Sequence, residues 1–342
     1  AILRSTGMRG FGPNSLGIVN TSTGLTTSYF SNYLTLRPGN VGLIGQSGIF
    51  VGALLHYLSS FETLRISKAI SLGNKVEVDE IDALNYLMED EQTRVVGMYL
   101  EDIKDGRRFL EEARKAVIHK PVLLLKGGST PEGAHASASH TASMAVDDAV
   151  LNGALNQIGV LRMGGMDELV ETLMGFLYMP LPRGNRIAIV SYSGAQAIMS
   201  VDTAIRAGFM LASFADETRE RLSRVIPTPS KAQNPIDIYP DMLQHGFEKT
   251  NTEILRALLE DQGVDGIIFI AYTETTNIYR PLVEVIQEYG NKPVFFSVLG
   301  MKEEVEEFLC FFGNYGIPSY RFPEMAIRVL ANMLRYTQAL ER

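Results

Sequence analysis

Short apolar segments of strand length alternate with longer segments of helical periodicity along most of the 342-residue chain. The alternation predicts strands at residues 41–45, 66–72, 94–100, 121–126, 160–163, 186–191, 266–271 and 293–298. It predicts helices at residues 48–60, 78–90, 106–117, 145–158, 167–178, 195–207, 215–225, 252–261, 278–289, 302–311 and 323–339. Strands joined through helices form parallel sheets, because a parallel connection must cross over the sheet. We therefore expect an α/β fold in which helices cover both faces of parallel sheets, giving three layers.

The alternation is interrupted near the middle of the chain. Pro180, Pro182 and Gly184 break the helical periodicity just before a strong strand begins at Arg186. A chain of this length fits two domains of about 150 residues better than a single core. We expect a first domain over residues 1–180 and a second over 185–342, each opening with a strand, a Ser-Gly turn and a helix.

Composition and charge exclude several classes of protein. The chain is 46% hydrophobic and 20% charged, which is typical of folded globular proteins. Its apolar runs are far shorter than the roughly 20 residues of a membrane span, so we expect no membrane partner. The net charge of −8 argues against a nucleic-acid partner, which requires a basic face. A single cysteine, Cys310, rules out an internal disulfide and indicates a reducing, cytoplasmic setting.

Two short turns of small residues each follow a predicted strand. The first turn comprises Gln46, Ser47, Gly48 and Ile49, and the second comprises Ser193, Gly194 and Ala195. Neither has the three spaced glycines of a dinucleotide-binding turn or the Lys-Ser/Thr of a P-loop. Free N–H groups at the start of the following helix favour an anion such as phosphate. Alternatively, both are the ordinary tight turns that any α/β sheet requires.

A long segment of small residues separates the strand at 121–126 from the helix at 145–158. Residues 127–143 consist almost entirely of Gly, Ala, Ser and Thr, with two histidines, His135 and His140. A loop of this length within a compact domain is uncommon and is usually functional. The two histidines are five residues apart and no third ligand lies nearby with zinc-like spacing, so we expect no metal site.

Glu101 directly follows the predicted strand at 94–100. Ligands of open parallel sheets bind at the carboxyl ends of the strands, which makes Glu101 a candidate site residue. A solvated loop that begins with Glu101 and Asp102 explains the same position equally well.

Five motifs follow one another along nearly the whole chain. They are Gly-Pro-Asn-Ser-Leu-Gly-Ile-Val-Asn at 12–20, the Ser-Gly turn within 42–48, Ser-Leu-Gly-Asn at 71–74 with Asp79, Asp82 and Leu84 after it, Ser-His-Thr-Ala-Ser-Met at 139–144, and Asn-Pro-Ile-Asp at 234–237. The set resembles the nucleoside-diphosphate-forming acyl-CoA synthetases, of the ADP-forming acetyl-CoA synthetase type and related to succinyl-CoA synthetase. The histidine motif is the most specific of the five. The resemblance implies two flavodoxin-like domains of the succinyl-CoA-synthetase kind.

The resemblance also implies an acid–thiol ligase reaction, in which acyl-CoA, phosphate and ADP are reversibly converted to acid, CoA and ATP. It implies that His140 is transiently phosphorylated, and that Glu101 fixes the tautomer of the imidazole and stabilises the cation that forms. By the same resemblance, the two Ser-Gly turns hold the phosphoryl group at either end of its transfer. The segment 127–143 is then the arm that moves between them.

The family's CoA-binding domain and ATP-grasp domain are not recognised in the sequence, which begins with Ala1. We therefore expect a fragment of an oligomeric enzyme whose partners are those two domains, on the same chain or in a partner subunit, together with phosphate. CoA and ADP or ATP, with Mg on the nucleotide, are then substrates bound mainly by those domains, and no cofactor is tightly bound. The alternatives are a regulatory or scaffold module that kept the fold and lost turnover, and a flavodoxin-like electron carrier or receiver domain, which leaves His140 unexplained.

Overall fold

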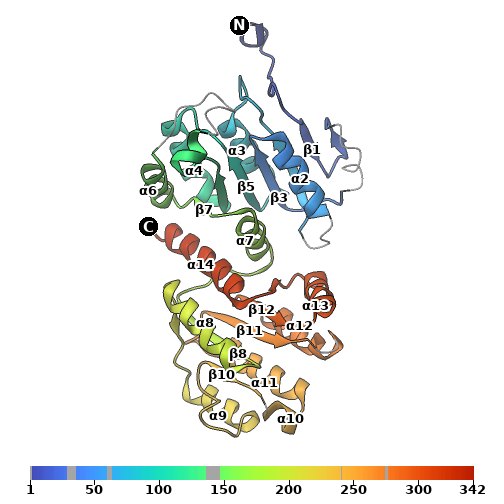
Figure 1. Cartoon of the computed structure of the whole chain (residues 1–342), viewed down its shortest axis with the longest axis vertical. Coiled ribbons are helices and arrows are strands. Elements are labelled where there is room, and N and C mark those ends of the chain that lie inside the picture. The colour runs from blue at the N-terminus through green and yellow to red at the C-terminus, as the bar shows by residue number, and fades with distance from the viewer. Residues whose placement is uncertain (1, 29–35, 60–63, 136–146, 240, 274–275) are drawn as a thin grey trace. The chain divides into compact units, whose positions relative to one another are not determined.

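The computed structural model describes residues 2–28, 36–59, 64–135, 147–239, 241–273 and 276–342. It divides into two compact units, one formed by Ala1–Leu177 with Gln338–Arg342 and the other by Tyr178–Thr337. In each unit an open sheet has helices against its faces (Figure 1). The expected α/β fold with mainly parallel sheets is confirmed.

The first unit contains a seven-stranded sheet of order β2-β1-β4-β3-β5-β6-β7. Its strands are β1 (Ile18–Asn20), β2 (Leu25–Thr26), β3 (Val41–Gly45), β4 (Ile66–Ser71), β5 (Val95–Leu100), β6 (Val122–Lys126) and β7 (Leu161–Met163). The strands from β3 to β7 are parallel, whereas β1 runs antiparallel to β4 and to β2. The sequence did not predict β1 or β2, because strands of two or three residues show no hydrophobic period.

Helices of the first unit lie on both faces of this sheet. The helices after β3 are α2 (Gly48–Ser59), α3 (Glu80–Glu89), α4 (Gly106–His119), α6 (Asp148–Ile158) and α7 (Met166–Tyr178), and a short helix, α1 (Ile2–Thr6), precedes the sheet in the sequence. A Cβ atom added to Gly42 would lie 2.7 Å from Leu87 of α3, and one added to Gly97 would lie 3.3 Å from Leu173 of α7. Gly97 is the register partner of Leu43, and successive residues of a strand face opposite sides. The helices α3 and α7 therefore cover opposite faces.

Residues 131–135 are also helical, so the prediction of an uninterrupted loop over 127–143 is wrong there. Thr130 begins this turn: its carbonyl accepts from the N–H of Ala134 at 2.7 Å, and its Oγ1 accepts from the N–H of Gly133 at 3.0 Å. Threonine before a proline at the first helical position is a usual start for a helix. The dipeptide Thr130-Pro131 was the signal in the sequence.

The second unit contains a six-stranded sheet in which β10-β8-β11-β12-β13 are neighbours and β9 also pairs with β8. Its strands are β8 (Arg186–Ser191), β9 (Met210–Leu211), β10 (Ile236–Asp237), β11 (Gly266–Tyr272), β12 (Val294–Leu299) and β13 (Ser319–Tyr320), and all their pairings are parallel. Its helices are α8 (Gly194–Arg206), α9 (Asp216–Val225), α10 (Asp241–His245), α11 (Phe247–Glu260), α12 (Arg280–Tyr289), α13 (Lys302–Asn314) and α14 (Pro323–Leu340), with a 3₁₀ turn at Thr276–Tyr279.

The two sheets share one topology. The order β4-β3-β5-β6-β7 in the first corresponds to β10-β8-β11-β12-β13 in the second, so the first strand of each set lies between the second and the third. The order of strands reverses between β3 and β5, and again between β8 and β11. In doubly wound sheets such a reversal, at the carboxyl ends of the strands, is where ligands bind. Both predicted turns lie at a reversal, since Ser47 follows β3 and Ser193 follows β8.

Candidate functional site

The turn after β3 is so closely packed that two of its positions must be glycine. A Cβ atom on Gly45 would lie 2.1 Å from Val51 Cγ2, and one on Gly48 would lie 2.7 Å from Leu16 Cγ. Glycine at these two positions therefore lets α2 and the segment that carries Leu16 close on the turn. Gly48 and Ile49 are the first two residues of α2, and the first N–H groups of a helix have no acceptor within it. The turn thus presents backbone donors at the end of the sheet.

The motif at 12–20 lies against the motif at 71–74. Ser15 Oγ donates to the carbonyl of Ser71 at 2.5 Å, and the N–H of Asn74 donates to the carbonyl of Pro13 at 2.9 Å. Gly73 has φ +62°, and a Cβ atom there would lie 2.3 Å from the carbonyl oxygen of Pro13. The N–H of Gly73 also donates to the carbonyl of Gln46 at 3.0 Å. Three motifs that are distant in sequence thus meet at one edge of the sheet.

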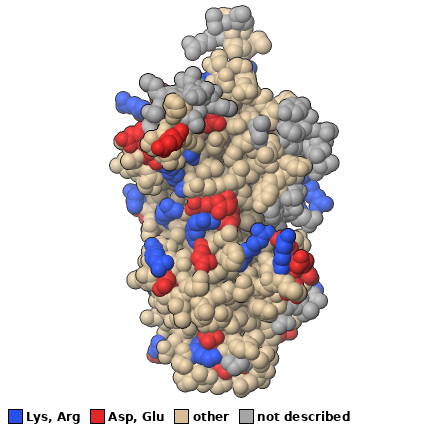
Figure 2. Space-filling view, viewed as in Figure 1, with Lys and Arg blue, Asp and Glu red and all other residues tan. Residues whose placement is uncertain are grey.

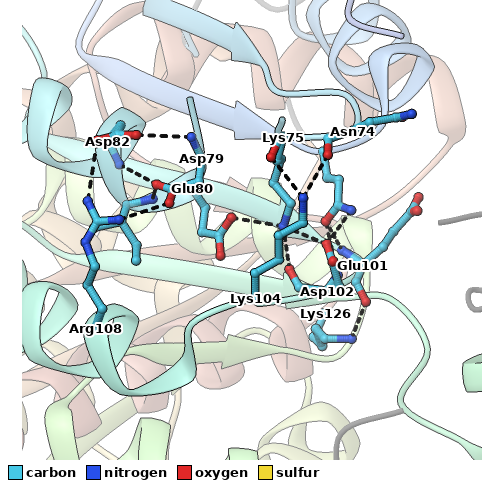
Figure 3. Close-up of polar contacts among 12 residues, drawn as sticks. Asn74, Lys75, Asp79, Glu80, Asp82, Glu101, Asp102, Lys104, Arg108 and Lys126 are labelled. Carbon is cyan, nitrogen blue, oxygen red and sulfur yellow. Dashed lines mark hydrogen bonds and ion pairs between the residues drawn. The ribbon is translucent and has the colours of Figure 1, made fainter. Parts of the chain in front are cut away.

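Glu101 stands at the end of β5, beside this turn. Its N–H donates to Gln46 Oε1 at 2.9 Å, and Lys126 Nζ donates to its carbonyl at 2.8 Å (Figure 3). Tyr99 OH donates to Glu101 Oε1 at 3.3 Å. Among the residues that the structure describes, none donates to Oε2. The half-buried side chain of Glu101 extends away from the neighbouring ion pairs (Figure 3), so this oxygen is available to a further donor.

The phenol of Tyr99 is held in place beside that carboxylate. Its ring stacks on Phe50 with the centroids 4.2 Å apart, and a Cβ atom on Gly127 would lie 3.0 Å from its hydroxyl oxygen. Burial, reinforced by the charge of Glu101, raises the pKa of Tyr99. The phenol therefore stays protonated and remains a donor to Glu101.

Sequence reasoning missed both Tyr99 and Lys126. Lys126 ends β6 and is the register partner of Leu100, so the strand-end criterion that selected Glu101 also applied to it. Its amine donates to the carbonyls of Glu101 and Gly127, and burial, together with the charge of Arg162, lowers its pKa. Tyr99 carried no comparable signal, because a tyrosine within a strand usually only packs.

The second turn is partly capped by its own side chains. Ser193 Oγ accepts from the N–H of Gln196 at 3.4 Å, while the N–H of Ser193 donates to Ser191 Oγ at 3.0 Å. Gly194 and Ala195, the first residues of α8, contribute further N–H groups at the helix start.

The motif at 234–237 borders this second turn and divides into two roles. Asn234 Oδ1 accepts from the N–H of Ile189 at 3.1 Å, and its Nδ2 donates to the carbonyl of Ile187 at 2.8 Å, so Asn234 is structural. Asp237 is nearer the turn, because a Cβ atom on Gly194 would lie 3.7 Å from Asp237 Oδ2. Lys231 lies 3.5 Å from the same carboxylate and offsets part of its charge.

The structure therefore brings Gln46, Ser47, Gly48 and Glu101 together in the first unit. In the second unit it places Asp237 beside the second turn. His140 lies outside the described residues, and His135 is exposed. Within the described ranges no group of three or more His, Cys, Asp and Glu side chains has the arrangement of a metal site. No helix there is both long and apolar enough to span a membrane. Acidic and basic side chains are interspersed on the face shown in Figure 2.

Comparison with known proteins gives a consistent result. Residues 38–176 match the succinyl-CoA ligase like flavodoxin domain. The chain is 35% identical over 98% of its length to acetate–CoA ligase [ADP-forming] II of Archaeoglobus fulgidus, and spans 50% of that protein. It is 34% identical over 94% of its length to the alpha subunit of acetate–CoA ligase [ADP-forming] II of Pyrococcus furiosus, and spans 70% of that subunit.

A solved structure is also similar. The dinucleotide-forming acetyl-coenzyme A synthetase 1 of Ca. Korarchaeum cryptofilum, in complex with phosphate and ADP, superposes with a TM-score of 0.91 at 28% identity. The match covers 99% of this chain and 73% of that one. The chain thus spans about half the length of the Archaeoglobus fulgidus protein and about three quarters of the solved one.

Proposed function

Because the chain belongs to the ADP-forming acyl-CoA synthetases, we propose that it carries the phosphohistidine step of such an enzyme, with His140 as the phosphorylated residue. The whole enzyme would convert acyl-CoA, phosphate and ADP into acid, CoA and ATP. The observation that most supports this proposal is Glu101, a half-buried carboxylate at the strand-order reversal whose backbone is held by Gln46 and Lys126.

In this mechanism phosphate displaces CoA from the acyl-CoA to form an acyl phosphate, the neutral imidazole of His140 attacks its phosphorus, and the acid leaves as a carboxylate. The phosphoryl group then passes from His140 to ADP. Glu101 Oε2 accepts the N–H of the other ring nitrogen, which fixes the tautomer and stabilises the imidazolium that forms on attack. Tyr99 donates to Oε1, so the carboxylate is already oriented by a second hydrogen bond. Charge stabilisation of this kind matters because the phosphoryl group in transfer is highly charged.

We assign the two turns to the phosphoryl group. N–H groups from Ser47 to Ile49 would bind phosphate or phosphohistidine at the start of α2, and those of Gly194 and Ala195 would do so at the start of α8. The position of each turn at a strand-order reversal supports this assignment. Asp237 makes the second turn the less favourable for a bare anion.

Nucleotide and CoA would be bound by an ATP-grasp domain and a CoA-binding domain, on the same polypeptide or in a partner subunit, with Mg on the nucleotide. Two facts support this division of labour. The chain spans only half of the Archaeoglobus fulgidus relative, and another relative is named as an alpha subunit.

The test is phosphorylation of the chain in the presence of an ATP-grasp domain of the family, Mg and ATP labelled at the γ-phosphate. The wild-type chain should take up acid-labile, base-stable label. His140→Ala should take up none, and His135→Ala, the matched control in the same segment, should label like the wild type. Glu101→Gln keeps the size of the side chain and removes its charge, so labelling should slow roughly a hundredfold.

Equal labelling of His140→Ala would overturn the assignment of the phosphorylated residue. Unchanged labelling of Glu101→Gln would leave the assignment of His140 intact, but it would mean that Glu101 only begins a solvated loop.

A further inference from the structure

A buried cluster of ion pairs lies directly behind Glu101. Lys75 Nζ donates a hydrogen bond to the carbonyl of Asp102 at 2.8 Å and forms ion pairs with Asp102 Oδ1 at 2.6 Å and Glu80 Oε2 at 2.9 Å (Figure 3). The side chains of Lys75, Glu80 and Asp102 are 0%, 1% and 10% exposed. Charges withdrawn so far from water are tolerated only when they are paired, so each member of the cluster constrains the others.

Gln46 connects this cluster to Glu101. Its Nε2 donates to Asp102 Oδ1 at 2.5 Å, and its Oε1 accepts from the N–H groups of Glu101 at 2.9 Å and Asp102 at 3.1 Å. A carboxylate can only accept and a backbone N–H can only donate, so one orientation of the Gln46 amide satisfies all three partners. The N–H of Gln46 also donates to the carbonyl of Tyr99 at 2.9 Å. The turn after β3 and the end of β5 are therefore joined through one side chain.

The backbone of Lys75 adds an independent observation. Its φ is +52°, in the left-handed region that residues other than glycine rarely adopt. Lys104 Nζ holds this bend by donating to the carbonyls of Asn74 at 3.0 Å and Lys75 at 2.9 Å. Conformations of this kind persist where the surroundings hold them, and they are concentrated at functional sites.

We propose that Lys75 is a positioning residue for the phosphoryl transfer: through Asp102 and Gln46 it fixes Glu101 relative to the turn at Ser47. This inference rests on the proposed role of Glu101 toward His140. The carboxylate must meet the imidazole while the turn holds the phosphoryl group, and a displacement of about 1 Å in such a geometry can cost a hundredfold in rate. Neither Lys75 nor Asp102 needs to touch the substrate.

Three variants test the proposal. Lys75→Met leaves two buried carboxylates without a cation and should reduce the yield of folded protein. Lys75→Met combined with Glu80→Gln still removes the ion pair between Lys75 and Asp102. The cluster of this double variant keeps the net charge of −1 that one lysine and two carboxylates have in the wild type. Lys68→Met is the matched control, because Lys68 is also a buried lysine of the first unit (8% exposed), paired with Asp90 at 2.8 Å.

The first measurement is hydrogen exchange at the amides of Glu101 and Asp102 in the 342-residue chain. Both amides donate to Gln46, so the double variant should exchange them at least about tenfold faster, while Lys68→Met should leave their rates unchanged. Unchanged rates in the double variant would overturn the proposal. This measurement needs no phosphorylation, so it decides the positioning of Glu101 even if His140 proves not to be the phosphorylated residue.

The second measurement is labelling from γ-labelled ATP, with the rate constant at saturating ATP separated from the final amplitude. A loss of folded protein lowers the amplitude alone. The double variant should instead lower the rate constant about tenfold or more and leave the half-saturating ATP concentration unchanged. Adding Glu101→Gln to the double variant should give no further slowing beyond Glu101→Gln alone, because Lys75 acts through Glu101. Fully multiplicative slowing would overturn the proposal.

Discussion

The pKa of Lys292, a buried side chain of the second unit, is strongly shifted by its surroundings. The residue is 8% exposed, and its amine donates to the carbonyls of Leu258 and Asp261 near the end of α11. Burial lowers the pKa of Lys292 to about 8, although the carboxylates of Asp261 and Asp265 oppose the shift. The folded chain therefore releases this proton at a lower pH than the unfolded chain.

A pH dependence of stability follows. Between pH 8 and 10.5 the unfolded lysine still binds its proton and the folded one does not, so the free energy of unfolding rises with pH by at most about 1.4 kcal/mol per unit. Below that range both states are protonated and the contribution is constant. Urea unfolding of wild type and Lys292→Met at several pH values should give a difference in stability that is flat below pH 8 and grows above it. A difference independent of pH would refute the assignment.

Individual site residues could be predicted from the sequence only where one local rule selects them. Glu101 and the small residues of the first turn follow from their positions after strands, and the same rule would have found Lys126. Gln46 was selected for its backbone, yet its side chain joins the ends of β3 and β5. Lys75 could not be predicted from the sequence. It is buried and paired with Glu80 and Asp102 only because the segment after β4 packs against the end of β5.

Replacing glycine by alanine should change the free energy of unfolding in opposite directions at two positions of the first unit. Gly73 has φ +62°, and a Cβ atom there would lie 2.3 Å from the carbonyl oxygen of Pro13. Gly73→Ala should lower the free energy of unfolding by more than the about 1–2 kcal/mol that a left-handed backbone alone costs. Gly153 is exposed within α6 and has no atom within 4 Å of such a Cβ, so Gly153→Ala should raise it by about 0.5–1 kcal/mol.

Urea titration of both variants against wild type checks this pair, and changes of the same sign would contradict it. The comparison also separates two uses of glycine. In α6 glycine only weakens a helix, whereas at position 73 it allows the motif at 12–20 to approach the end of β4.

Elements with a strong period were predicted closely, and β3 and β8 have the predicted bounds. The helix α11 begins at Phe247, five residues before the predicted start at residue 252. Thr250, Asn251 and Thr252 favour helix weakly, but Phe247 packs on the rings of Tyr192 and Tyr279, at centroid distances of 5.7 and 5.2 Å. Tertiary packing therefore extends this helix beyond what its local sequence indicates.

The segment that connects the two sheets should be the first place where a protease cuts the chain. Residues 179–185 form neither helix nor strand, and Arg183 is exposed among them. Protease sites are most accessible in such segments, because the backbone must unfold locally to enter a protease. Brief digestion with trypsin should first cut after Arg183 and give fragments 1–183 and 184–342, identified by mass. A first cut after Arg114, within α4 (Gly106–His119), would contradict the described fold.

The antiparallel strand β1 has a practical consequence for anyone who shortens this chain. All six residues of β4 are buried, and β1 covers the outer edge of β4 through the pairs Ile18–Ile70, Val19–Ala69 and Asn20–Lys68. A piece trimmed to residues 38–176, the range of the family match, would lack β1 and leave a row of unpaired backbone groups along β4, a strand that is buried in the whole chain. Such an edge is a template for pairing with another copy. The short strands β1 and β2 therefore protect the first unit against aggregation, and pieces made for expression should begin before Ile18.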